Sequence, residues 1–144
     1  MKSLLKILFG SLLFFGLSSC GDQSAEVVPS ASSEGQAEAE VQLLDAASAA
    51  AFLAENSPTI IDVRTQEEFA AGYISGATLI DISSPVFADA ISALDRSATY
   101  FVYCRSGNRS ATATSKMIEL GFTSVFELDG GIVSWAAAGN DIQT

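Results

Sequence analysis

From residue 41 onward, short apolar runs alternate with segments whose apolar residues recur at helical spacing. Runs rich in valine and isoleucine are typical of buried strands, and a spacing of three or four residues is typical of helices that face a core. The runs that predict strands are 41–44, 59–63, 79–82, 100–103 and 125–128. The segments that predict helices are 45–54, a short one that starts at 65, 85–94, 109 or 110 to 120, and 132–138. This alternation predicts a single α/β domain with a five-stranded, mostly parallel sheet and helices on both faces.

Helix boundaries are marked by residues with known capping chemistry. Asp45 precedes the first helix and is a typical N-cap. Thr65 and Glu68 have the spacing of a capping box, which opens a helix with Phe69 turned inward. Gly121 follows the fourth helix, where a glycine commonly ends the helical backbone.

Cys104 lies between the predicted strand 100–103 and the helix that follows it. In open α/β sheets, sites form beyond the carboxyl ends of the strands, which is where this cysteine falls. Backbone N–H groups and the positive end of a helix stabilise an anion there, and the adjacent Arg105 and Arg109 favour a lowered thiol pKa. We therefore expect Cys104 to be a thiolate nucleophile, the alternative being a buried and inert thiol.

The first forty residues have a different character from the rest. Lys2 and Lys6, the apolar run 7–17 and two serines predict a secretory signal over 1–19, and this run is too short to span a membrane. Leu17-Ser18-Ser19-Cys20 resembles a bacterial lipobox, which implies a lipid on Cys20; the alternative is an ordinary cleaved signal. Residues 20–40 read as a flexible tether and 41–144 as the domain. We expect an exported protein, lipid-anchored to a bacterial membrane and facing the periplasm, with Cys104 as its remaining thiol.

The charge of the chain limits its partners. It has 17 acidic residues, 7 lysines and arginines and no histidine, for a net charge of −10. Such an acidic protein lacks the basic surface that nucleic acid requires. Arg105, Arg109 and Lys116 nevertheless form a local positive cluster, which suits a small anionic substrate. Lys116 is the exception we expect to face solvent.

Four successive blocks of this sequence resemble single-domain rhodaneses, the sulfurtransferase family. The blocks are 62–64 with 67–69, then 72–77, then 104–110, and last 128–132 with Trp135. They occur in the family's order and span about residues 41–140. The resemblance implies a parallel five-stranded α/β domain whose loop amides surround a persulfidated Cys104. Tyr73 stands where the family often has histidine, and no imidazole base is available anywhere in the chain.

This resemblance assigns expected roles around Cys104. The loop residues predicted to contact substrate are Arg105, Ser106, Gly107, Asn108 and Arg109. Arg109 has an equal alternative, a pair with a carboxylate such as Asp62 or Glu68. Asp62, Arg64 and Ser110 are expected to support the site from behind: the first two chiefly as a structural pair and Ser110 chiefly as a helix cap. Gly130-Gly131 and Trp135 are expected to form a tight turn and a core anchor.

The expected reaction moves a sulfane sulfur from a small anionic donor such as thiosulfate to a thiol or cyanide acceptor through a Cys104 persulfide. We expect no cofactor and no metal. One alternative is a noncatalytic persulfide carrier or sensor, which needs the same loop. Another is a cysteine-dependent phosphatase or arsenate reductase, whose signature has arginine six positions after the cysteine. This chain has Ser110 at that position and arginine at 109, which favours sulfur chemistry.

Overall fold

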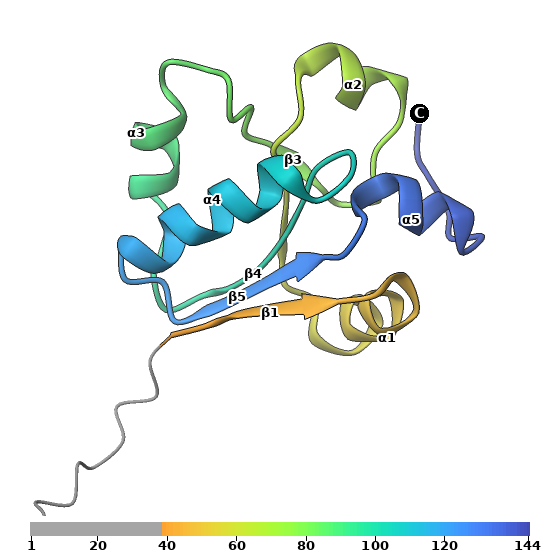
Figure 1. The fold of residues 1–144 in the computed structure, drawn as a ribbon, viewed down its shortest axis with the longest axis horizontal. Helices are drawn as coiled ribbons and strands as arrows, with labels where there is room; N and C mark the ends of the chain where they lie inside the picture. Colours follow the sequence, from red (N-terminus) through yellow and green to blue (C-terminus); the bar gives the residue numbers. More distant parts are fainter. Residues whose placement is uncertain (1–38) are drawn as a thin grey trace, which may run out of the picture. The chain divides into compact units, whose positions relative to one another are not determined.

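The computed structural model describes residues 39–144 (Figure 1). The predicted signal, the Cys20 lipid site and all but the end of the predicted tether lie outside the described residues. The sheet has the order β1-β5-β4-β2-β3, and every neighbouring pair is parallel. Its strands are β1 (Val41–Leu44), β2 (Thr59–Asp62), β3 (Thr78–Leu79), β4 (Thr99–Tyr103) and β5 (Ser124–Leu128). The helices are α1 (Ala46–Asn56), α2 (Gln66–Ala71), α3 (Phe87–Ser92), α4 (Asn108–Glu119) and α5 (Gly131–Ala137).

Helices cover both faces of the sheet, as the alternating pattern predicts (Figure 1). On one face, Ile91 of α3 and Met117 of α4 pack on β4 residues such as Val102. On the other, Ala49 of α1 and Trp135 of α5 pack with the β4 residues Phe101 and Tyr103. Successive β4 side chains therefore enter opposite cores, which explains why this central strand has no polar alternation.

The predicted caps form. Asp45 accepts a hydrogen bond of 2.7 Å from the backbone N–H of Ser48 at the start of α1. Thr65 and Glu68 exchange side-chain and backbone hydrogen bonds in both directions, so the capping box is confirmed. Phe69 is only half-buried and stacks on Tyr73 with ring centroids 4.3 Å apart.

The third strand and third helix are shorter than predicted. β3 ends at Leu79, although the N–H groups of Ile80 and Ile82 still donate to the β2 side at Asp62 and Val63. Beyond them, side chains bind nearby backbone and form turns: Asp81 accepts from the N–H of Ser83, and Ser84 from that of Val86. Such local bonds compete with strand and helix, so α3 starts at 87 rather than 85.

Within residues 39–144, no helix is long and apolar enough to cross a membrane. The same part of the chain has no group of three or more acidic or cysteine side chains placed to hold a metal ion.

Candidate functional site

Cys104 follows the last residue of β4 and is buried, with 1% of its surface exposed. It continues the strand's alternation and belongs to the same core as Val63, Val102 and Ala113. Burial on this side is a consequence of β4 being the central strand of the sheet. The thiol is therefore held by packing before any polar contact is considered.

Two donors reach the Cys104 sulfur. The backbone N–H of Gly107 is 3.1 Å from Sγ, and the Ser110 hydroxyl is 3.4 Å from it. Burial is the largest influence on the thiol and raises its pKa, but hydrogen bonds from Ser110 and from the backbone of Ser106 and Gly107 outweigh it and lower the pKa overall. The pKa of the Cys104 thiol is therefore lowered, as expected, and hydrogen bonds from the loop and from Ser110 lower it.

Gly107 makes this geometry accessible. Its φ is 101°, a backbone conformation that residues other than glycine rarely adopt, and it is the N-cap of α4. The helix therefore begins at Asn108, slightly earlier than predicted, and the turn aims its N–H at the sulfur.

The start of α5 is hydrogen-bonded to the Cys104 loop, residues 104–107 between β4 and α4. The N–H groups of Ile132 and Val133 donate to the carbonyls of Cys104 and Arg105 at 2.9 and 3.2 Å. A Cβ on Gly131 would lie 2.5 Å from the Cys104 carbonyl oxygen, so only glycine fits this close approach. The glycine pair predicted as a tight turn thus also positions the active loop. Trp135, its indole N–H donating to Asp141, is buried as the expected core anchor.

Three loop side chains point to solvent: Arg105, Ser106 and Asn108 are all exposed. Within residues 39–144, the Arg105 guanidinium has no carboxylate partner. It remains free to meet an anion at the loop.

Arg109 adopts the second of its two expected roles. Its guanidinium donates two hydrogen bonds to Glu68, at 2.7 and 2.8 Å, rather than contacting Asp62. These bonds lower the pKa of Glu68 to about 2. The pair connects α2 to the first turn of α4, next to the Cys104 loop, and the Glu68 charge compensates that of Arg109.

Asp62 and Arg64 form the structural pair that the sequence favours. The Arg64 guanidinium donates to both Asp62 oxygens, with the shortest bond 2.6 Å, and to the carbonyl of Gly72 at 2.7 Å. Both side chains are buried. They fasten the end of α2 to β2, and neither hydrogen-bonds to Cys104.

Ser110 does not cap α4, so that expectation is wrong. It lies inside the helix, where its hydroxyl is 2.7 Å from Glu127 of β5 as well as 3.4 Å from the sulfur. Sequence reasoning missed Glu127, which is 5% exposed. The sequence does contain an indication of this residue. Glu127 stands two positions after Val125, so it lies on the face of β5 that points into the core, where an acidic side chain is unusual.

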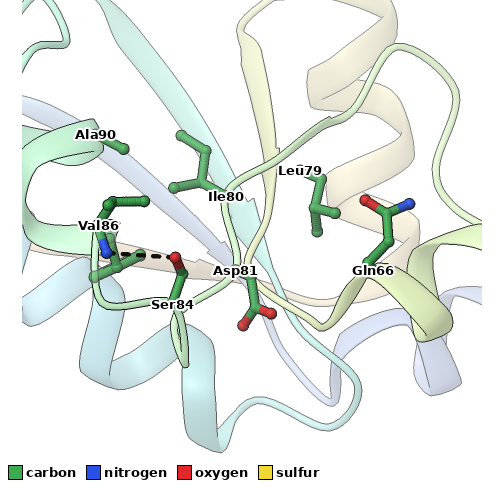
Figure 2. A pocket seen from close by; sticks show the side chains of 8 residues that line it. Gln66, Leu79, Ile80, Asp81, Ser84, Val86 and Ala90 are labelled. Atoms are coloured by element: carbon green, nitrogen blue, oxygen red, sulfur yellow. Dashed lines mark hydrogen bonds between the residues drawn. The ribbon is translucent and has the colours of Figure 1, made fainter.

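A separate pocket of about 330 Å³ lies between the start of α2, β3 and α3 (Figure 2). Its lining is mostly apolar, with Asp81 and Ser84 among the polar residues, and the Cys104 loop does not contribute to it. Another of about 350 Å³ includes Arg64, Glu68 and Val133 and thus borders the residues that hold the loop.

Together these features describe a buried sulfur with two hydrogen-bond donors that can stabilise a negative charge on it. Cys104 has a lowered pKa, a backbone donor and a hydroxyl donor, while the chain has no histidine to act as a base. This arrangement suits attack by a thiolate that is already ionised.

The sequence profile of the rhodanese-like domain family matches residues 34–138. Thiosulfate sulfurtransferase GlpE of Pseudomonas aeruginosa is 42% identical over 83 residues, which are 58% of this chain and 74% of that protein. A rhodanese-related protein from Thermoplasma volcanium has a similar structure, with a TM-score of 0.63 and 31% identity over 71% of this chain and 97% of its own. A possible tyrosine phosphatase from Rhodopseudomonas palustris has a TM-score of 0.58 and 29% identity over 72% and 85%.

Proposed function

Since this chain belongs to the rhodanese-like domain family, we propose that it is a sulfurtransferase that carries sulfane sulfur on Cys104. The observation that carries the proposal is the Cys104 sulfur itself, buried at the carboxyl end of β4 with a lowered pKa and donors from Gly107 and Ser110. The likeness to thiosulfate sulfurtransferase GlpE supports a small anionic sulfur donor such as thiosulfate.

The reaction has two displacements. The Cys104 thiolate attacks the outer sulfur of thiosulfate; a new S–S bond forms, the S–S bond of thiosulfate breaks, and sulfite leaves with the electron pair. A thiolate or cyanide then attacks the outer sulfur of the persulfide, and the electron pair of that S–S bond returns to Cys104. With cyanide the product is thiocyanate. Each step exchanges one sulfur bond for another and needs no external base.

The loop residues have distinct roles in this proposal. The Gly107 N–H and the Ser110 hydroxyl stabilise negative charge on the Cys104 sulfur before the first step and after the second. Arg105, exposed and without a carboxylate partner in the described part of the chain, binds the sulfonate oxygens of the donor. Arg109 holds the loop through Glu68, and Ser106 and Asn108 border the entrance.

Phosphatase chemistry is the less supported alternative. Its signature has an arginine six positions after the cysteine, whereas position 110 is serine and the neighbouring Arg109 side chain is paired with Glu68. Assays with an aryl phosphate and with arsenate, run beside thiosulfate and mercaptopyruvate, test this directly.

The deciding experiment is incubation of the purified full chain with thiosulfate. We expect the peptide containing Cys104 to gain the mass of one sulfur atom and to release thiocyanate on addition of cyanide. Cys104→Ser should abolish both, while Ser115→Ala, an exposed hydroxyl on α4 away from the sulfur, should change neither. Absence of the mass gain would refute the proposal, and a single turnover without further cycles would identify a persulfide carrier instead.

We also propose that the protein is exported and anchored through a lipid on Cys20, facing the periplasm. The support is the charged, apolar and small-residue order of the first twenty residues. A labelled fatty acid should be incorporated into the wild-type chain in a bacterial host and not into Cys20→Ala. Release of an unlabelled wild-type protein into the soluble fraction would contradict the anchor.

A further inference from the structure

The Ser110 hydroxyl has more acceptors around it than hydrogens to donate. Its oxygen lies 3.4 Å from Cys104 Sγ, 2.7 Å from Glu127 Oε1 and 2.8 Å from the Gly107 carbonyl. A serine hydroxyl carries one hydrogen. The Gly107 carbonyl also accepts the N–H of Ala111 at 2.9 Å, but a carbonyl can accept two hydrogen bonds, so the sulfur, the carboxyl and this carbonyl compete for the one hydrogen of Ser110. An ionised acceptor binds that hydrogen more strongly than a neutral one.

Among residues 39–144, the side-chain hydrogen-bond partners of the Glu127 carboxyl are the hydroxyls of Ser110 and Thr114. Its second oxygen is 3.1 Å from Thr114 Oγ1, which also lies 3.2 Å from the Ala111 carbonyl. No cation pairs with Glu127 among residues 39–144. This differs from Asp62 and Glu68, each of which is paired with an arginine.

Two anions joined by one hydrogen would be unstable in this setting. Cys104 is 1% exposed and Glu127 5% exposed, so neither has much solvent to stabilise its charge. Burial raises the pKa of Glu127, the nearby charge of Asp129 raises it further, and the bonds from Ser110 and Thr114 oppose both. Three groups act on this carboxyl: Asp129, which follows β5, and Ser110 and Thr114 of α4. The Cys104 sulfur, on the other side of Ser110, is the competing anion.

We propose that Glu127 is a positioning residue for the Cys104 sulfur: as a neutral carboxyl it donates its O–H to Ser110 Oγ, and the Ser110 hydroxyl then donates to the thiolate. In this arrangement Thr114 donates to the other Glu127 oxygen, and every polar group of the cluster has a partner. An ionised Glu127 would instead accept from both Ser110 and Thr114, and the sulfur would lose its hydroxyl donor. The proposal rests on the proposed function for the role of the thiolate, but the cluster itself is tested without any sulfur donor.

The test is the pH dependence of Cys104 alkylation by iodoacetamide in the full chain, followed on the peptide that contains Cys104. Glu127→Gln keeps an N–H donor toward Ser110 and should leave the profile close to that of the wild type. Ser110→Ala should slow alkylation at pH 6 about tenfold, because a hydrogen bond to the thiolate is lost and the thiol pKa rises. Glu127→Ala should slow it in the same direction, because the Ser110 hydroxyl is no longer oriented toward the sulfur and can donate to the Gly107 carbonyl instead. Thr123→Ala, which removes an exposed hydroxyl bonded to the Arg96 carbonyl just before β5, is the control and should have no effect.

Two results would overturn the proposal. Faster alkylation of Glu127→Gln at pH 6 would show that an ionised carboxylate had been opposing the thiolate. Unchanged profiles in Ser110→Ala and Glu127→Ala would show that the cluster only packs.

Infrared spectroscopy gives an answer that does not depend on how the alanine variants fold. At pH 7 the wild type should have a carbonyl stretching band of a protonated carboxyl that Glu127→Gln lacks, and absence of this difference would contradict a neutral Glu127. Because neither readout involves thiosulfate, failure of sulfur transfer with these results intact would refute the proposed function alone.

Discussion

Asp62 on β2 and Glu127 on β5 are both buried carboxylates near the carboxyl end of the sheet, but their partners differ. Asp62 accepts hydrogen bonds from the Arg64 guanidinium on both oxygens. The partners of the Glu127 oxygens are instead the hydroxyls of two uncharged residues, Ser110 and Thr114. A guanidinium supplies a permanent charge and a fixed geometry. Hydroxyls can turn and can donate or accept. Asp62 therefore fixes the position of β2 and the end of α2, whereas the Glu127 carboxyl can respond to the charge on the neighbouring sulfur.

A third acidic residue, Glu68, links these two regions. It lies on α2, whose end is fastened by Arg64, and it binds Arg109 in the first turn of α4. The Cys104 loop is thus supported from β2 through ion pairs and from α5 through backbone hydrogen bonds. Variants that break each of these supports separately test whether the ion pairs and the α5 contacts fix the position of the loop, while the group of Ser110, Thr114 and Glu127 acts on the sulfur.

The largest effect is expected for Asp62→Ala. Removing one partner leaves the buried Arg64 charge uncompensated, which should lower the free energy of unfolding by about 3 to 5 kcal/mol. Urea denaturation followed by circular dichroism measures it. Glu119→Ala, which removes an exposed pair with Lys116, is the control and should change stability by less than about 1 kcal/mol. Equal effects of the two variants would contradict a structural role for Asp62.

Gly131→Ala should have the next largest effect. Gly131 and Gly139 both have positive φ, 61° and 81°, but only at Gly131 would a Cβ meet backbone atoms of Cys104 and Arg105. Gly139→Ala therefore isolates the conformational cost, and Gly131→Ala should lose about 1 to 3 kcal/mol more because the loop must shift. Cys104 alkylation should also slow in Gly131→Ala alone. If the two variants behave alike, the contact with α5 does not position the loop.

Glu68→Gln should have a smaller and pH-dependent effect. Arg109 lowers the pKa of Glu68 from its ordinary 4.5 to about 2, so the folded state favours the ionised carboxylate. The stabilisation is fully present above pH 4.5, where about 1 kcal/mol is expected for this partly exposed pair, and it is lost as the pH falls toward 2. We therefore expect the free energies of unfolding of the wild type and Glu68→Gln, measured between pH 7 and 2, to become equal at low pH. A difference that stays constant with pH would point to lost packing.

The smallest effect on stability is expected for Arg105→Ala. Its side chain is exposed, so the unfolding midpoint should hardly change. If Arg105 binds the donor, KM for thiosulfate should rise several-fold, while transfer from a preformed persulfide to cyanide should be little affected. Lys116→Ala removes an equally charged but more distant side chain and is the control. A similar KM rise in both would indicate a general effect of surface charge.

Much of the frame was predictable because it depends on local patterns. The strand 41–44 and the caps at Asp45 and Thr65 were confirmed without adjustment, since strand alternation and capping involve residues next to each other in the chain. The third strand was predicted too long, because the apolar residues after Leu79 still pack on the core while serine and aspartate side chains turn the backbone away.

The order of strands and helices, and from it a parallel α/β sheet with Cys104 at its carboxyl edge, followed from the amino-acid sequence, because periodicity and the strand-edge rule need no knowledge of distant contacts. The rhodanese family was indicated separately, by the resemblance of four sequence blocks. The partners of Arg109 and Ser110 did not follow from the sequence. Arg109 binds Glu68, which is 41 residues away in the sequence. Ser110 contacts Glu127 and the Cys104 sulfur and does not cap the helix as predicted. Such choices depend on which buried groups the packed sheet and helices bring within about 3 Å of one another, and hydrogen bonds are selective only at that range.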